Sequence, residues 1–544
     1  ILLYIINLII LFKLLERLMK GLNQYLPLLV TLLFMAHPLH TEVVASLKNR
    51  EEILCYLFAL WSVWQVFKFI DGRKWTRILL AVFFFVLAYL SKETSYTFIV
   101  IIPLTVYFFS DLQHKKTIII FLVFFVVAFL LRKIITLNFP GTYESALYEN
   151  PLIPKTGIVM KLIAVPAVLW FYLKMLIFPH PMGFYYGYNM IPVEEFSYIT
   201  VISAAIHLFL LVFAIMGLKK KRLSAYAILY YLVSIYIFSN YSLKINGIVG
   251  ERLVYQASLG FAIILAILIY KLLKTQPGEL SIPSKRLKYI FGLVILILLP
   301  YTGKTIMRNA DWHDHFTLYS ADIDHLENSA KANSLIGNWL HQHLNEYSGQ
   351  EKTKAITDAE KYYKRSLMID TSDAQVANNL GTIYMLYIHN PDSAIKYFRQ
   401  CISIDSAYSH AHFNLAQCYE LKSMNPEAVS SYKTALKYNP EYTDKISKIS
   451  INYASSGFFE QAKQLNRILI DVNPGSPVPY YNMANIYVLS GDTAGGLEYA
   501  EKSLELDPSN YMLALKTAEF FKALGNEEKA DYYLVLAEKF KGKK

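Results

Sequence analysis

The hydrophobic and polar positions of the chain follow two patterns that meet near residue 307. Before that point, long apolar runs alternate with short polar loops, as expected for helices that cross a bilayer with about 20 apolar residues each. From about residue 330, small and apolar residues recur with a period of about 34 residues. The pattern predicts an all-α chain: a polytopic membrane domain over 1–306, a juxtamembrane linker over 307–329 and a helical repeat array over 330–544.

About ten apolar segments in the first part are candidates for membrane helices. Their approximate ranges are 1–19, 25–36, 52–70, 78–91, 94–110, 117–134, 158–178, 199–217, 225–240, 252–273 and 288–305. Cytoplasmic loops of membrane proteins are enriched in Lys and Arg, so the basic loops predict the sidedness. Basic loops at 13–24, 71–77, 111–116, 218–222 and 271–288 are therefore expected inside. The remaining loops, and everything after about 305, are then expected outside the cytoplasm.

Segment 158–178 breaks this alternation, because the loops 135–157 and 179–198 on either side of it are both expected outside. We therefore expect this segment to be re-entrant or to lie along the interface, where its Lys161 and Lys174 are less costly than in a span. A miscounted short span elsewhere would also restore the alternation.

Composition excludes other classes of protein. Of 544 residues, 54% are hydrophobic and only 17% charged, which excludes a single soluble globule. The net charge of +11 comes largely from the short loops, so nucleic-acid binding is not expected. The three cysteines (Cys55, Cys401 and Cys418) lack the spacing of a metal site or a disulfide framework.

The unusual polar residues of the membrane part gather in the loops assigned to the outer side. His37, His40 and Glu42 are close in one such loop and are residue types that bind a metal or a phosphate, although a polar helix start is the simpler explanation. The pairs Lys92-Glu93 and Glu251-Arg252 and the residue His180 occur in other such loops. Arginine clamps phosphate with its planar fork. An interfacial ion pair or a salt bridge is the alternative for each pair, but their common side predicts a site for a lipid-borne phosphate.

The same stretches carry a family resemblance. In order, the chain reads "HPLHTEVVASLKNREEIL", "LSKETSYTF", "ENPL", "FPHP", "GERLVYQASLGF" and "RNADWHDHFTLY". This set resembles the transmembrane and TPR-containing protein O-mannosyltransferases and their bacterial relatives, which belong to the GT-C superfamily, and it covers nearly the whole chain. The resemblance implies a GT-C-like membrane domain that transfers a mannose-like sugar from a polyprenyl-phosphate donor to an extracytoplasmic protein.

The resemblance also implies which residues bind the donor phosphate. The positions that match the family's motifs are His37, His40, Glu42, Lys92, Glu93, His180, Glu251 and Arg252. GT-C enzymes carry a catalytic acidic residue in their first external loop, which is expected upstream of Ile1, so no catalytic residue is assigned in this sequence. No metal ligand is assigned, and a requirement for a divalent metal stays open. Relatives often have an Asp-Tyr pair where this chain has Tyr185-Tyr186.

The repeat resembles the tetratricopeptide repeat (TPR). In the copy 409–442 the matching positions are Leu415, Ala416, Tyr419, Ala428, Tyr432, Ala435 and Pro440. Further copies are expected at 330–373, 374–408, 443–476, 477–510 and 511–544. Six helix pairs would form an α-solenoid whose concave groove binds a protein or peptide. Asn379, Asn414 and Asn482 share one repeat position and are candidates to bind the acceptor backbone, although Asn is also simply common there.

Three functions remain open from the sequence. The leading one is a membrane glycosyltransferase whose repeats hold a protein acceptor. The second is an oligosaccharide ligase or polymerase of the same superfamily, and the third is a non-enzymatic, membrane-anchored TPR scaffold. Because residues 541–544 carry no eukaryotic retention signal, the expected location is a bacterial inner membrane with the repeats in the periplasm.

Overall fold

The computed structural model describes residues 1–138, 150, 152, 157–188, 190–193, 196–241 and 245–541. Within these ranges the regular structure is helical, with one isolated bridge between Lys20 and Leu22, which confirms the all-α prediction. The chain forms two compact units, Ile1–Trp339 and Leu340–Lys544.

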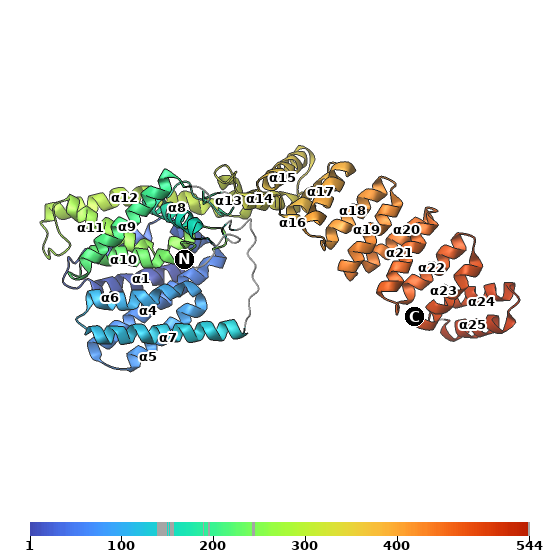
Figure 1. The fold of residues 1–544 in the computed structure, drawn as a ribbon, viewed down its shortest axis with the longest axis horizontal. Coiled ribbons are helices and arrows are strands. Elements are labelled where there is room, and N and C mark those ends of the chain that lie inside the picture. Colours follow the sequence, from blue (N-terminus) through green and yellow to red (C-terminus); the bar gives the residue numbers. More distant parts are fainter. Residues whose placement is uncertain are drawn as a thin grey trace. The chain divides into compact units, whose positions relative to one another are not determined.

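In the first unit, each apolar segment predicted from the sequence corresponds to a helix (Figure 1). These are α1 (Leu2–Leu18), α2 (Leu26–Met35), α4 (Arg50–Gly72), α5 (Thr76–Ser91), α6 (Phe98–Phe109), α7 (His114–Asn138), α8 (Ile158–Ile177), α9 (Tyr198–Leu218), α10 (Leu223–Tyr236), α11 (Ser258–Leu272) and α12 (Ser284–Asp311). Short elements between them carry most of the polar motifs: α3 (His40–Ala45), η1 (Leu47–Asn49), η2 (Glu93–Thr97), η3 (Glu251–Val254) and, after α12, α13 (His315–Asp322).

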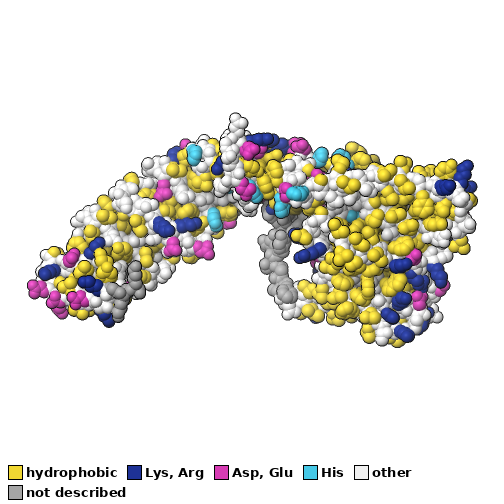
Figure 2. Space-filling model, turned by 180° about the vertical axis from the view of Figure 1, so that it is seen from behind, with side chains coloured by type: hydrophobic (Ala, Val, Ile, Leu, Met, Phe, Trp, Pro, Cys, Tyr) yellow, Lys and Arg dark blue, Asp and Glu magenta, His cyan; other side chains and the backbone are white. Residues whose placement is uncertain are grey.

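The surface of this unit is apolar in the manner of a membrane protein. By length and composition, the described residues contain five helices that could cross a bilayer: Leu47–Gly72, His114–Asn138, Met160–Ile177, Tyr198–Leu218 and Ser284–Asp311. In α7, Ile118, Leu122 and Phe129 are each about half exposed, and Figure 2 shows hydrophobic side chains spread across this part of the molecule. Such a surface is unfavourable in water but matches the hydrocarbon of a bilayer. The first unit is therefore a membrane domain.

The helical bundle has two chemically different ends, which we call the basic end and the polar-loop end. At the basic end lie the loops predicted to be cytoplasmic, and contacts join them: Arg17 pairs with Asp71, and Lys221 Nζ donates to the Ser110 carbonyl at 2.8 Å. At the polar-loop end lie α3, η2 and η3, which meet in one buried network. Which end faces the cytoplasm stays a prediction from the basic loops.

Helix α8 contacts residues of the polar-loop end near both its first and its last turn. Near its start, the Lys161 ammonium lies 4.7 Å from the centroid of the Tyr241 ring. Near its end, the Leu176 carbonyl accepts a hydrogen bond of 3.0 Å from His37 Nε2. Tyr241 and His37 both belong to polar-loop segments, so these contacts favour a helix that lies along that surface, although its length would also allow a crossing.

Close packing of α10 against α11 depends on Gly260. A Cβ atom at this position would lie 2.5 Å from the Ala227 carbonyl oxygen and 2.9 Å from the Tyr231 backbone nitrogen. Small residues let membrane helices approach backbone to backbone. The absence of a side chain at Gly260 therefore sets the distance between two central helices.

We expect Gly260→Ala to destabilise the membrane domain by about 1–3 kcal/mol, because backbone atoms cannot move aside as a flexible side chain does. The matched control is Gly303→Ala in α12, where a Cβ would meet no atom within 4 Å. Thermal unfolding of both variants in detergent measures the difference. Equal unfolding temperatures for the two variants would contradict this account of the α10–α11 contact.

The second unit consists of stacked helix pairs, seen side by side in Figure 1. The pairs are α16 (Ala374–Leu386) with α17 (Pro391–Ile404), α18 (Ser409–Leu421) with α19 (Asn425–Tyr438), α20 (Thr443–Ser455) with α21 (Phe459–Val472), α22 (Pro477–Leu489) with α23 (Thr493–Leu506) and α24 (Tyr511–Ala523) with α25 (Glu527–Phe540). Helix α15 (Gly349–Ile369) packs on α16, and α14 (Ala330–Gln342) contains the boundary between the two units. The repeat tyrosines pack between helices: Tyr384 stacks on Tyr397, and Tyr487 on Tyr499, each at 5.5 Å between ring centroids.

A backbone feature repeats with the same period as the sequence. The turn between the two helices of a pair contains one residue with positive φ, namely His389, Ser423, Gly457, Gly491 and Gly525. Glycine adopts this left-handed conformation at no steric cost, whereas other residues rarely do. The later copies have glycine at this turn, and the earlier copies form the same turn with His389 and Ser423.

Candidate functional site

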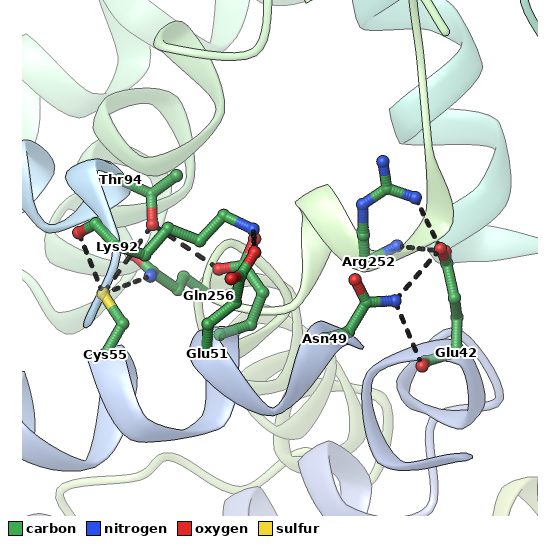
Figure 3. A network of polar contacts seen from close by, with 9 residues as sticks. Glu42, Asn49, Glu51, Cys55, Lys92, Thr94, Arg252 and Gln256 are labelled. Carbon is green, nitrogen blue, oxygen red and sulfur yellow. Dashed lines mark hydrogen bonds and ion pairs between the residues drawn. The ribbon is translucent and has the colours of Figure 1, made fainter. Parts of the chain in front are cut away.

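At the polar-loop end, an ion pair joins two segments that lie far apart in the sequence (Figure 3). The Arg252 guanidinium of η3 donates through Nη1 to Glu42 Oε1 of α3 at 2.6 Å, and the Arg252 backbone N–H donates to Glu42 Oε2 at 2.9 Å. Asn49 donates to the same carboxylate at 3.3 Å. Because Glu42 is buried and bonded at both oxygens, it fixes the position of Arg252.

Arg252 is both held and accessible. Its side chain is 28% exposed, whereas that of Glu42 is 4% exposed. Within the described part of the chain, Glu42 is its hydrogen-bonding partner, so Nε and Nη2 remain available to another group. The Glu42 carboxylate raises the pKa of Arg252 further above its ordinary value, although burial opposes the charge. A fixed guanidinium with free N–H groups suits a phosphate or a carboxylate.

Lys92 forms a second cluster, and it does not pair with its neighbour Glu93. Its ammonium lies 2.6 Å from Glu51 and 3.0 Å from Glu52, both at the start of α4. Burial opposes the charge of Lys92, but the two carboxylates outweigh it and raise the pKa of the amine. Glu93 is exposed. The interfacial pair considered from the sequence is therefore replaced by a lysine that bridges two carboxylates.

Further polar side chains lie next to this cluster. Thr94 donates to Glu52 at 3.5 Å, and Thr94 and Gln256 both contact the Cys55 thiol (Figure 3). Reasoning from the sequence did not single out Glu51, Glu52 or Gln256, because nothing in a linear chain shows that residues 51, 92 and 256 meet. The signal available was the Glu51-Glu52 pair beside an apolar run, where uncompensated carboxylates are costly.

His37 and His40 are buried, and their ring nitrogens are occupied by protein groups. His40 bonds the Tyr4 hydroxyl at 2.8 Å and the Ser258 hydroxyl at 2.9 Å, while His37 Nε2 bonds the Leu176 carbonyl. Burial lowers the pKa of His37 to about 4, and burial with the nearby His37 lowers that of His40. Two neutral, fully bonded rings hold α1, α8 and α11 around the site. In the described part of the chain, no three His, Cys, Asp or Glu residues are placed to hold a metal.

Glu251 bonds other groups than Arg252 does, in a network that the sequence did not predict. Its Oε1 accepts bonds from the Gly183 N–H at 2.6 Å and the Tyr186 hydroxyl at 3.0 Å. Nearby, the buried Arg308 forms a bidentate ion pair with Asp322, in which Nη1 donates to Oδ1 at 2.6 Å and Nη2 donates to Oδ2 at 2.8 Å. This network connects η3 and the segment after α8 to the end of α12. The neighbouring residues Glu251 and Arg252 thus bind different partners.

His180 lies outside both clusters. It is exposed, and its ring centroid is 5.8 Å from that of His325. Partial burial, together with the positive charges of Lys304 and Lys174, lowers the pKa of His180. Of the predicted donor residues, the structure thus brings Glu42 and Arg252 into direct contact, places Lys92 in an adjoining cluster and leaves His180 and Glu93 at the surface.

An apolar groove of about 630 Å³ opens beside this end of the bundle. Its walls come from α8, α9, α10, α11 and α12, and its lining is Leu173, Leu176, Ile177, Leu210, Ile228, Tyr231, Gly260, Phe261, Ile264, Leu265, Leu268, Leu296, Ile297, Pro300 and Tyr301. Leu176 is also the residue whose carbonyl binds His37. The groove therefore adjoins the polar site, and Lys304 follows Tyr301 by about one helical turn.

The three asparagines proposed to bind an acceptor make contacts within the array. Asn414 donates to Asn378 of the preceding pair at 3.3 Å, and Asn482 donates to Ser447 of the preceding pair at 3.0 Å. The Asn379 side chain bonds Tyr363. These amides link successive repeats, and their binding of an acceptor stays a prediction.

We expect Glu251 to make the stability of the membrane domain depend on pH. Burial raises the pKa of Glu251 from 4.5 to about 8, despite the opposing effect of Arg308. The folded state therefore holds a proton that the unfolded state loses, so stability falls as the pH rises from about 4.5 to about 8. Glu251→Gln should lessen this fall in thermal unfolding experiments, whereas Asp324→Asn, at an exposed residue, should not. Equal slopes in wild type and Glu251→Gln would contradict the assignment.

Comparison with known families supports the repeat assignment. The model of the tetratricopeptide repeat matches residues 374–408, 409–442 and 479–510. The first two ranges coincide with copies predicted from the period, and the third lies within the predicted copy 477–510. The chain also aligns with a crystal structure of MamA protein at 21% identity, covering 32% of this chain and 92% of that one with a TM-score of 0.24.

Among curated proteins, the chain is similar to a protein O-mannosyl-transferase of Caenorhabditis elegans, with 23% identity over 354 residues that cover 63% of this chain and 46% of the relative. Protein O-mannosyl-transferase TMTC3 of Mus musculus is 23% identical over 398 residues, covering 66% of this chain and 40% of the relative. These matches span less than half of each relative, but they exceed the share of this chain that follows residue 330, so they include part of the membrane domain. The chain is a distant homologue of the protein O-mannosyl-transferases and carries tetratricopeptide repeats in its C-terminal part.

Proposed function

We propose that the chain acts as a membrane glycosyltransferase that moves a mannose-like sugar from a polyprenyl-phosphate donor to a protein bound by the repeats. The observation that carries the proposal is Arg252, which the buried Glu42 fixes while 28% of its side chain stays exposed. An arginine held in this way is prepared to bind an anionic oxygen group without further loss of side-chain freedom.

The apolar groove supports a lipid-linked donor. Apolar side chains dominate its walls, and its volume of about 630 Å³ lies in the range of ligand sites. Tyr172 of α8 lies near Arg252, and the next residue, Leu173, lines the groove. One helix therefore borders both the proposed phosphate site and the proposed site for the polyprenyl chain.

Charge balance favours Arg252 over Lys92 as the phosphate ligand. Lys92 lies between two carboxylates, so with both ionised its cluster carries a net negative charge that repels phosphate. The Arg252–Glu42 pair is neutral and keeps donor groups free. We assign to Lys92 the role of fixing the start of α4 next to η2.

Transfer to a protein hydroxyl also needs a general base to remove the proton of the acceptor. Glu42, Glu51 and Glu52 each bind a cation in the structure. We therefore assign the general base to no residue of this sequence. A divalent metal is not part of the proposal.

The repeats support a protein or peptide acceptor, because TPR grooves bind polypeptides. In the proposed arrangement the array lies on the same side of a bacterial inner membrane as the Arg252 site, in the periplasm. The sidedness rests on the basic loops, and the choice of mannose rests on the names of the relatives.

We expect the double substitution Glu42→Gln/Arg252→Gln to weaken binding of polyprenyl-phosphate mannose by roughly tenfold or more, as charge-assisted hydrogen bonds to the phosphate are lost. Changing both residues leaves a neutral pair that can still form a hydrogen bond. Arg252→Gln alone would instead leave the buried Glu42 carboxylate without its cation. Binding to the chain in nanodiscs is the measurement. The control is Arg132→Gln, which removes an exposed positive charge from α7.

The outcomes separate the candidate functions. Weaker donor binding in the double variant, unchanged binding in the control and equal thermal stability of both would support the proposal. Unchanged donor binding in the double variant would exclude Arg252 as the phosphate ligand. No binding by the wild-type chain would favour the TPR scaffold, and transfer of a preassembled glycan would favour the oligosaccharide ligase.

A further inference from the structure

A second groove lies at the basic end of the bundle, away from the polar-loop site. It has a volume of about 380 Å³ and lies between the end of α4, the start of α5 and the start of α7. Its lining is Phe69, Arg73, Trp75, Ile78, Lys116, Ile119, Ile120, Val123 and Phe124. The groove thus combines apolar walls, which continue along α5 and α7, with two cations at the ends of helices.

Four cations around this groove have no acidic partner among the residues that the structure describes. Arg73, Lys74, Lys115 and Lys116 are exposed, and in the described part of the chain none of them forms an ion pair. The two nearby acidic residues are engaged elsewhere: Asp71 pairs with Arg17, and Asp111 lies 3.8 Å from Lys221. The basic charge at the groove is therefore not compensated by any acidic residue in the ranges that the structure describes.

The helix ends add to the same positive potential. Both α5 and α7 begin at this groove, and neither has an acidic residue in its first turn. The amino end of a helix carries a partial positive charge and is usually stabilised by Asp or Glu. Here the first turn of α5 contains Arg77 and that of α7 contains Lys115 and Lys116. These positive side chains are repelled by the partial positive charge of the helix ends. An anion at the mouth of the groove would remove this repulsion.

Local packing keeps the groove open and places its cations. Arg73 ends α4 in the left-handed conformation, with φ of 53°, and its N–H bonds the Phe69 carbonyl at 2.7 Å. Trp75 is 71% exposed and contacts the Phe69 ring at 5.2 Å between centroids. Deeper in the bundle, Phe85 packs on Phe124 and joins α5 to α7. Exposed tryptophan beside lysine and arginine is typical of the level of lipid head groups.

We propose that this groove binds an anionic phospholipid of the leaflet at the basic end. The head-group phosphate would lie between Arg73 and Lys116 at the two helix ends, and an acyl chain would lie along Ile119, Val123 and Ile78. Basic pockets between membrane helices on the cytoplasmic side bind anionic lipids by this combination of charge and apolar contact. The proposal needs only the membrane domain and is independent of the proposed glycosyl transfer.

The test is native mass spectrometry of the full chain in detergent, titrated separately with phosphatidylglycerol and phosphatidylcholine. We expect the wild type to retain one phosphatidylglycerol in preference to phosphatidylcholine. Arg73→Gln/Lys116→Gln should lower the apparent affinity for phosphatidylglycerol by roughly tenfold or more. The control Lys285→Gln/Lys288→Gln removes the same charge from the exposed start of α12, which does not line the groove, and should retain the lipid.

A third variant tests the apolar half of the site without changing charge. Val123→Trp would fill the groove and should also reduce lipid retention, and circular dichroism establishes that each variant is folded. Equal losses in the two charge variants would overturn the proposal, because they would show diffuse attraction to the basic end. Equal binding of the two lipids by the wild type, or displacement of phosphatidylglycerol by an equimolar amount of inorganic phosphate, would overturn it as well.

Discussion

The pairing of Glu42 with Arg252 is the interaction on which the proposed site depends. A carboxylate that is 4% exposed is costly unless a cation and hydrogen bonds compensate it. Arg252 supplies both its guanidinium and its backbone N–H, so α3 and η3 must lie together although the two partners are 210 positions apart in the sequence. The pair also fixes the exposed part of the guanidinium. The same contact thus maintains the fold of the polar-loop end and presents a cation to a ligand.

The neighbouring networks hold this pair in place without competing for a ligand. The neutral rings of His37 and His40 tie α8, α1 and α11 to α3, which carries Glu42, and to the residues just before it. On the other side of η3, Glu251 bonds the segment after α8, next to the Arg308–Asp322 pair. Of these residues, only Arg252 combines partial exposure with free donor groups in the described structure. The site is therefore small, and most of the polar side chains around it have a structural role.

The two ends of the bundle use positive charge in different ways. At the polar-loop end, Arg252 and Lys92 are each paired with carboxylates, which fix their orientation and leave neither positive charge uncompensated. At the basic end, Arg73 and Lys116 have no carboxylate partner among the described residues and lie beside an apolar groove and two helix amino ends. Matched charge favours selective binding of a particular group, whereas unmatched charge favours a surface rich in anionic lipid.

The sequence by itself determined the elements of the chain, because hydrophobic period depends on local order alone: each predicted apolar segment is a helix, and the TPR copies at 374–408 and 409–442 were placed by their spacing. It also indicated Glu42 and Arg252, because both fall in loops that the basic-loop pattern assigns to one side of the membrane. Only the tertiary structure decided the partners. Lys92 binds Glu51 and Glu52 and not the adjacent Glu93, and Glu251 turns toward Gly183 and Tyr186 while Arg252 turns toward Glu42. The reason is physical: a buried charge is stabilised by whatever group the packing of distant helices brings within about 3 Å, and no local pattern records that distance.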